Sequence, residues 1–154
     1  MEKTFQVAKP ADFKTMIAEI LDNPQINTGE NLVIALQGDL GAGKTTFTQE
    51  LAKHLGVTET VNSPTFTIMK QYELSHPNFD TLVHMDAYRL ESETETKPLR
   101  LEELFSTPRT LVCVEWPEII PTSIPVDAVW VKINIDKDEV RIVTVKMGVE
   151  DSVD

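Results

Sequence analysis

The chain has 154 residues, of which 41% are hydrophobic, as expected for one globular domain over residues 1–154. Its 25 acidic residues outnumber its 14 basic residues, and the net charge of −11 argues against a broad basic nucleic-acid surface on the chain itself. No apolar stretch approaches the length of a membrane span, and the single cysteine cannot form an internal disulfide. These features predict a cytoplasmic protein that does not bind a membrane.

The first elements predicted along the chain are a short strand at residues 4–7 and an amphipathic helix that begins at Pro10, since proline suits the first turn of a helix. The apolar residues of this helix recur on one face: Phe13, Met16, Ile17, Ile20 and Leu21. The helix is expected to end near Asn23-Pro24, because proline cannot continue it.

Residues 38–45 read Gly-Asp-Leu-Gly-Ala-Gly-Lys-Thr and match the phosphate-binding pattern G-x-x-x-x-G-K-S/T. The glycines allow the loop to wrap closely around a β-phosphate, so that backbone N–H groups point at its oxygens. The Lys44 ammonium can reach β- and γ-phosphate oxygens, and the Thr45 hydroxyl can ligate Mg²⁺. The residues predicted to bind the nucleotide are Leu40, Gly41, Ala42, Gly43, Lys44, Thr45 and Thr46.

The segments around this loop have the order strand, loop, helix that such a site requires. Residues 32–36 form an apolar run that predicts a buried strand leading into the loop. After the loop, Phe47, Leu51 and Leu55 recur at four-residue spacing, and Gly56 marks the end of a helix. The N-terminus of that helix adds its positive dipole end to the anion site.

The rest of the chain predicts further strands and one short helix. The strands are expected at residues 66–72, 82–87 and 111–116, and the helix near residues 101–105. From residue 128, apolar and polar residues alternate, and the alternation resumes after the charged residues 136–139, which predicts a closing β-hairpin. The fold class is therefore α/β: a single-domain P-loop NTPase with a mixed, mostly parallel central sheet flanked by helices and a C-terminal antiparallel β-hairpin at one side.

Two of the apolar strands end in an acidic residue, Asp86 and Glu115. A phosphate-binding loop usually works with such a residue, which acts on Mg²⁺ or on the attacking water. Each also has a simpler interpretation: Asp86 could cap the segment that follows it, and Glu115 could pair with a basic neighbour. We predict a functional role for both, and the division of metal ligation and water activation between them stays open.

Four other residues are candidates with competing interpretations. Thr65, after Pro64, either senses the γ-phosphate or lies in a plain turn into a strand. His84 is expected to be a satisfied sheet histidine rather than a catalyst. Arg89 could act on phosphate or form a structural salt bridge, and Trp116 is expected to pack but could line the site.

ATP is the nucleotide that the sequence favours, because the Asn-Lys-x-Asp segment of guanine-specific proteins is absent. A small-molecule kinase of the P-loop class is the alternative, although kinases usually need several arginines or a lid, and this chain is arginine-poor. A third hypothesis is a nucleotide-gated binding module whose hydrolysis is incidental.

Four blocks of this sequence resemble the bacterial TsaE (YjeE) ATPase family in their order and spacing. These blocks are residues 38–47, the Ser-Pro-Thr-Phe of residues 63–66, the His-Met-Asp-Ala-Tyr-Arg-Leu of residues 84–90, and the Glu-Trp-Pro of residues 115–117. The resemblance runs from the first strand to the terminal hairpin. Ala87, where many members have leucine, is a mild departure.

The resemblance implies a small ATPase, weak alone, that acts in making the threonylcarbamoyl modification of adenosine 37 in tRNA. Its implied partners are the catalytic threonylcarbamoyl transferase subunit and that subunit's inactive paralogue, which would hold the tRNA. ATP hydrolysis would reset the transferase between turnovers. The resemblance also implies that Thr45 and Glu115 are Mg²⁺ ligands and that Asp86 and Glu115 serve hydrolysis, and it suggests adenine contacts near Pro10 and in the terminal hairpin.

Overall fold

The computed structural model describes residues 2–23, 31–39, 43–58, 69–88, 90 and 93–147. Its helices and strands, in chain order, are β1 (Glu2–Val7), α1 (Asp12–Asp22), β2 (Asn31–Gly38), α2 (Lys44–His54), β3 (Met69–Glu73), β4 (Thr81–Asp86), α3 (Leu101–Phe105), β5 (Thr110–Glu115), β6 (Val129–Ile135) and β7 (Arg141–Met147). Short 3₁₀ segments lie at Glu93–Leu99, Pro117–Ile119 and Pro121–Ser123. Within the described residues, no helix is long and apolar enough to cross a membrane.

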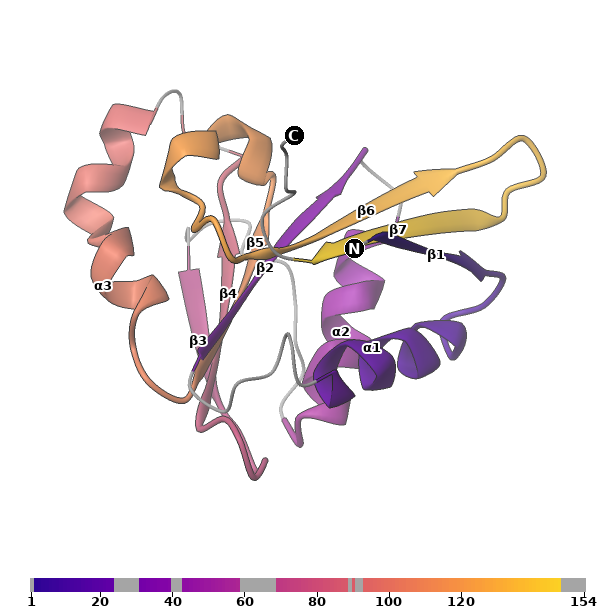
Figure 1. Ribbon diagram of the computed structural model, residues 1–154, viewed down its shortest axis with the longest axis horizontal. Helices are drawn as coiled ribbons and strands as arrows, with labels where there is room; N and C mark the ends of the chain where they lie inside the picture. The colour runs from indigo at the N-terminus through magenta and orange to yellow at the C-terminus, as the bar shows by residue number, and fades with distance from the viewer. Residues whose placement is uncertain are drawn as a thin grey trace.

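The strands form one seven-stranded sheet in the order β1-β7-β6-β2-β5-β4-β3 (Figure 1). The central strands β6, β2, β5 and β4 are parallel, whereas β7 runs antiparallel to β6 and to β1. The predicted α/β class, mixed sheet and C-terminal hairpin are confirmed. The structure adds an antiparallel strand at the other edge as well, because β3 pairs antiparallel with β4.

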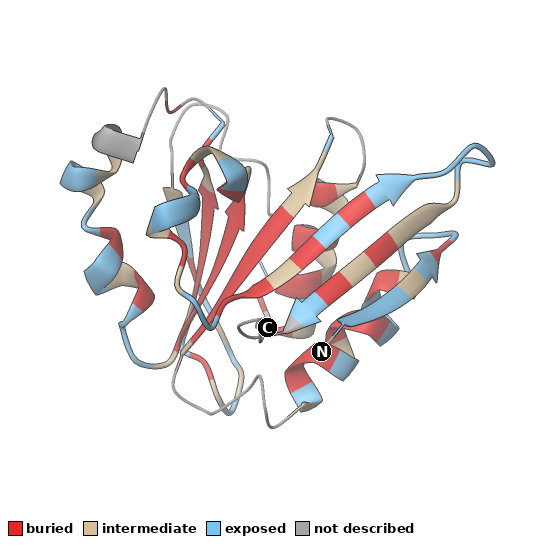
Figure 2. Ribbon diagram, turned by 45° about the horizontal axis from the view of Figure 1, so that its top comes forward, coloured by how far each residue is buried: buried red, intermediate tan, exposed pale blue. Residues whose placement is uncertain are grey.

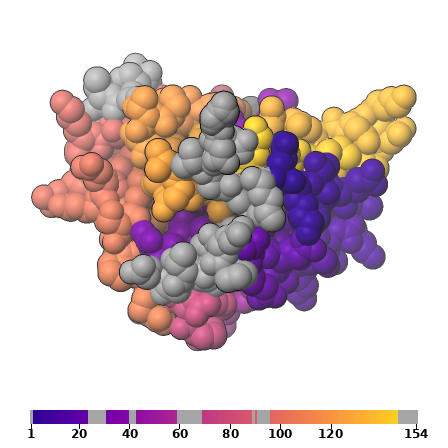
Figure 3. Space-filling model, viewed as in Figure 1, coloured from indigo at the N-terminus to yellow at the C-terminus, as the bar shows by residue number. Residues whose placement is uncertain are grey.

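The termini of the described chain meet in this sheet. Strand β1 pairs along its whole length with β7, from Glu2 opposite Lys146 to Val7 opposite Arg141. Figure 3 shows the consequence on the surface, where the N-terminal segment in indigo lies against the C-terminal hairpin in yellow. The first strand therefore extends the hairpin rather than the parallel centre.

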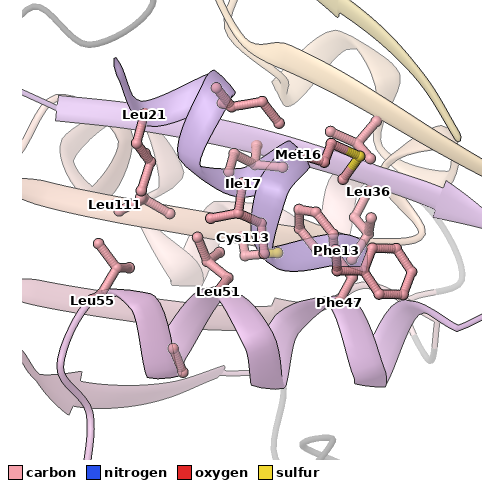
Figure 4. Close-up of a cluster of buried hydrophobic side chains, with 14 of the residues drawn as sticks. Phe13, Met16, Ile17, Leu21, Leu36, Phe47, Leu51, Leu55, Leu111 and Cys113 are labelled. Carbon is pink, nitrogen blue, oxygen red and sulfur yellow. The ribbon is translucent and has the colours of Figure 1, made fainter. Parts of the chain in front are cut away.

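One face of the sheet is covered by α1 and α2. The Phe13 and Phe47 rings of these two helices meet edge to face, with centroids 5.7 Å apart and an interplanar angle of 83°. Figure 4 shows them among the buried side chains of this layer, which also include Ile17, Leu51 and Leu111. Burial of each such side chain contributes about 1.5–3 kcal/mol. The apolar face predicted for the first helix is therefore the one that packs on α2 and the sheet.

The opposite face of the sheet packs against α3 and the 3₁₀ segments. Its buried residues alternate along the strands with those of the first layer: Val33, Ala35, Val83, Met85, Val112 and Val114. Leu101 and Phe105 of α3 complete this second layer. Because β5 is covered on both faces, all six of its residues are buried, which explains its continuous apolar run.

Helix and strand ends differ slightly from the predicted ones. Helix α1 begins at Asp12, two residues after Pro10, and the Asp12 carboxylate accepts hydrogen bonds from the N–H groups of Ala8 and Lys9 at 3.0 and 3.1 Å. Part of the strand predicted at residues 66–72 lies outside the described residues, and β3 begins at Met69.

Candidate nucleotide-binding site

The candidate site lies at one edge of the sheet, where three parallel strands end. Strand β2 ends at Gly38, β4 at Asp86 and β5 at Glu115. Asp86 lies opposite Glu115 in the pairing of β4 with β5. Because these strands are parallel, their carboxyl ends meet, and the loop that follows β2 begins beside both carboxylates.

Gly43 begins α2 in a conformation that glycine alone adopts readily. Its φ is +114°, and its carbonyl accepts the Phe47 N–H at 2.9 Å to close the first helical turn. A Cβ at this position would lie 2.7 Å from Nε of Arg141, which comes from β7. The positive φ therefore calls for glycine at this position, and a larger residue would also require the flexible end of the Arg141 side chain to move.

The described part of the loop holds Gly43, Lys44, Thr45 and Thr46, of which the last three form the first turn of α2. Five of the residues predicted from the sequence to act in the site or near it lie outside the described residues: Leu40, Gly41, Ala42, Thr65 and Arg89. The remaining predicted residues, Asp86 and Glu115, lie at the same edge of the sheet as this helical turn.

The Lys44 side chain is folded into the site rather than exposed to solvent. Its Nζ donates a hydrogen bond to the Gly38 carbonyl at 2.6 Å and lies 3.5 Å from the centroid of the Trp116 ring. Burial lowers the pKa of this ammonium. Four nearby carboxylates oppose that effect: Glu115, Glu118, Asp86 and Asp39. The lysine is thus held at the loop by a carbonyl and an aromatic face.

Trp116 is a site residue as well as a packing residue. It has a φ of +59°, and its ring lies 5.0 Å from that of Tyr88, tilted by 44°. This left-handed conformation directly follows Glu115, and the indole covers the Lys44 ammonium. The sequence left packing and lining of the site as alternatives; the structure shows the indole packed against the Tyr88 ring and lying over the Lys44 ammonium.

Glu115 is buried and makes a short contact with a histidine. Its Oε2 lies 2.5 Å from Nε2 of His84, and the side chains are 5% and 0% exposed. His84 lies in the middle of β4, as predicted, but it is only partly satisfied, because its Nδ1 has no hydrogen-bond partner among the described residues. The contact between His84 and Glu115 has no local sequence signal, although the two apolar runs end at corresponding acidic residues, Asp86 and Glu115, which the pairing of β4 with β5 places side by side.

Asp86 is half-buried, and one of its oxygens is already engaged. Its Oδ1 accepts the Tyr88 N–H at 2.9 Å, so the capping role is present. Burial raises the pKa of the Asp86 carboxyl, the Tyr88 hydrogen bond lowers it, and the Glu115 charge raises it further. No hydrogen bond joins the other oxygen, Oδ2, to any of the described residues, and it can face a cation or a water at the strand end.

The residues at this edge fit a magnesium-bound nucleotide. Mg²⁺ prefers oxygen ligands and usually takes only one or two from protein carboxylates, with phosphates supplying others. Thr45, Asp86 and Glu115 offer such oxygens. In the described ranges, no group of three or more His, Cys, Asp or Glu residues could hold a metal by itself. The carboxylates around Lys44 would repel a bare triphosphate, which favours one that carries a divalent cation.

A parallel strand, a G-x-x-x-x-G-K-T loop, a helix and two acidic strand ends define a nucleotide-binding protein of the P-loop class. The family model for "Threonylcarbamoyl adenosine biosynthesis protein TsaE" matches residues 7–143. The chain belongs to the TsaE family.

Relatives and one solved structure agree with this assignment. The chain is 44% identical to a tRNA threonylcarbamoyladenosine biosynthesis protein TsaE from Bacillus subtilis over 73% of this chain and 67% of the relative. It is 38% identical to the protein of that name from Rickettsia bellii, over 73% of this chain and 75% of the relative. The crystal structure of Bacillus subtilis YdiB superposes with a TM-score of 0.71 at 28% identity, covering 96% of this chain and 86% of YdiB.

Proposed function

We propose that this chain binds and hydrolyses Mg-ATP as the ATPase subunit of the bacterial machinery that makes N6-threonylcarbamoyladenosine at position 37 of tRNA. Hydrolysis resets the transferase complex between turnovers. The observation that carries this proposal is the placement of Lys44 and Thr45 at the carboxyl edge of the sheet, beside Asp86 and Glu115, in a chain of the TsaE family.

Each residue of the site has a proposed role that follows from its chemistry. The backbone N–H groups of residues 40–44 bind the phosphates, and Lys44 exchanges the Gly38 carbonyl and the Trp116 ring for phosphate oxygens. Thr45 and Glu115 hold Mg²⁺, which when bound neutralises charge on the phosphates.

The remaining roles concern the reacting water and the state of the nucleotide. Asp86 and Glu115 orient the attacking water, because their carboxylates lie opposite each other at the ends of β4 and β5, on one side of the loop strand β2. Thr65 senses the γ-phosphate. The residue that changes partner most on nucleotide binding is Lys44, which makes its environment the most direct reporter of occupancy.

The proposed partners are the threonylcarbamoyl transferase catalytic subunit and its inactive paralogue, in the cytoplasm. The chain contacts tRNA only indirectly, through that complex. Its net charge of −11 supports this division, because a protein that bound tRNA tightly by itself would carry an excess of basic residues. The proposed activity is weak in the free chain and stimulated by the partners.

Phosphate release from Mg-ATP, measured with and without the transferase pair, tests the proposal. Slow release that rises strongly with the pair supports a coupled ATPase. Clear ATP binding without stimulation contradicts it and favours the alternative, a small-molecule kinase, which would consume ATP only with an acceptor. Lys44→Ala should weaken ATP binding, whereas Lys53→Ala, at the exposed end of the same helix, should not.

A further inference from the structure

We propose that His84 is a positioning residue for Glu115, and that its Nε2–H holds the Glu115 carboxylate in the orientation that nucleotide hydrolysis needs. The inference rests on the proposed function, because Glu115 is assigned there to Mg²⁺ and the attacking water. The contact that carries it is the 2.5 Å separation between His84 Nε2 and Glu115 Oε2.

The register of two strands creates this contact. In the pairing of β4 with β5, His84 lies opposite Cys113 and Asp86 lies opposite Glu115. His84 and Glu115 are therefore diagonal neighbours, and side chains two residues apart on a strand project from the same face. That face is the one covered by α2, since Cys113 belongs to the apolar layer beneath this helix.

The surroundings of His84 argue that the imidazole is present for this bond. The side chain is fully buried, Leu82 on the same face of β4 belongs to the apolar core, and Nδ1 has no hydrogen-bond partner among the described residues. An apolar side chain would avoid leaving a buried polar atom unpaired, which costs stability. The imidazole is thus explained by its one polar contact, Glu115.

The contact with His84 also determines which of two basic neighbours, His84 or Lys44, Glu115 contacts. Lys44 is also close to Glu115, because among the nearby carboxylates Glu115 raises the pKa of the Lys44 ammonium most strongly. In the described part of the chain, however, Glu115 makes its short side-chain contact with His84, and the Lys44 ammonium donates a hydrogen bond to the Gly38 carbonyl. His84 therefore restrains Glu115 from closing onto the lysine and keeps both groups separate for the nucleotide and its cation.

Two matched substitutions test this role. Gln and Met have similar length and volume, but only Gln offers an N–H donor near the position of Nε2. His84→Met should lower kcat for ATP hydrolysis about 10-fold or more while KM stays within about twofold, and His84→Gln should restore most of kcat. Equal kcat values for the two variants would overturn the positioning role.

A second readout does not depend on hydrolysis. With ¹⁵N-labelled histidine, the wild-type protein should show a downfield, exchange-protected His84 Nε2–H proton, and Glu115→Gln should move it upfield. An absent proton, or one that Glu115→Gln does not move, overturns the inference. This measurement tests the hydrogen bond between His84 and Glu115 even if the His84→Met variant fails to fold.

The two proposals fail in distinguishable ways. If the wild-type protein with its partners binds Mg-ATP but releases no phosphate, the proposed ATPase function fails. The Mg²⁺ dependence of nucleotide affinity then tests His84: a weaker dependence in His84→Met than in His84→Gln supports positioning of Glu115, and equal dependence overturns it.

Discussion

The central strands β2, β5 and β4 bury their residues differently from the wing β6-β7-β1, which joins the centre through the parallel pairing of β6 with β2 and is antiparallel within itself (Figure 2). Strand β5 is buried at all six positions, whereas β6 alternates buried residues such as Val131 with exposed ones such as Lys132. The centre is covered by helices on both faces, and the wing carries α1 on one face.

This difference explains where the polar site residues lie. In a strand that is covered on both faces, a polar side chain must find a partner, so its geometry is fixed. Lys44, His84 and Glu115 are the charged or imidazole side chains buried among the described residues, and each is held by a specific contact. Exposed polar residues of β6 in the wing, such as Lys132 and Asn134, face solvent and are under no such constraint.

The largest effect is expected for hydrolysis when Glu115, at the end of the central strand β5, is changed. Glu115→Gln should reduce phosphate release by about 100-fold or more, because the neutral amide neither ligates a cation well nor accepts a proton. ATP should still bind, which equilibrium binding checks. Glu102→Gln is the matched control, since Glu102 is exposed on α3 and is not among the carboxylates that act on Lys44. Unchanged hydrolysis in Glu115→Gln would remove Glu115 from the mechanism.

The next largest effect is expected on the free energy of unfolding when a buried side chain that packs on the central strands is truncated. Leu51→Ala, a truncation of a fully buried residue of α2, should lower the free energy of unfolding by about 2–5 kcal/mol. Lys132→Ala on the exposed face of β6 should change it by less than about 0.5 kcal/mol. Urea denaturation measures both, and similar losses for the two variants would contradict the contrast between centre and wing.

Gly43 tests the contact between the loop and the wing. Gly43→Ala should cost about 1–3 kcal/mol of stability, because it strains a φ of +114° and places a Cβ 2.7 Å from Arg141 Nε. Adding Arg141→Ala should relieve the steric part and leave the backbone part. A double variant no more stable than Gly43→Ala would show that the arginine is not the obstacle.

The smallest effect concerns pH. Burial raises the pKa of Asp86 above its ordinary value, so the folded state binds more protons than the unfolded state between the two pKa values. Wild-type stability should therefore fall, relative to Asp86→Asn, as the pH rises through this window. The variant should melt about 1–3 °C higher at pH 7, and the difference should vanish near pH 3. Thermal unfolding across pH checks the sign, and a constant difference would exclude ionisation as its cause.

Local patterns were sufficient to predict most of the fold. The apolar runs of β2, β4 and β5 predicted buried strands, because burial on both faces removes alternation from the sequence. The loop pattern fixed Gly43, Lys44 and Thr45, since phosphate binding needs those groups at those spacings. The five-residue β3 alternates too weakly for its antiparallel pairing to be predicted.

The contacts within the site were harder to predict, because they join residues distant in the sequence. His84 and Glu115 are 31 residues apart and meet through strand register. The contact of Lys44 with Trp116 depends on the left-handed backbone after β5, which no local signal gives. Arg141 of β7 approaches Gly43 from the other end of the chain, and the resemblance gave only a general indication of the terminal hairpin.

The reactivity of the single cysteine, Cys113, can be used to measure local opening of the protein. Cys113 lies under α2, with Sγ 3.7 Å from Thr48 Oγ1, and burial raises the pKa of its thiol to about 12. Because the thiol is buried and the thiolate is the reactive species, a thiol reagent should label the closed protein very slowly. The labelling rate therefore reports how often α2 separates locally from β5. If a nucleotide slows the labelling, the ratio of the two rates measures how much bound phosphate stabilises the closed position of this helix.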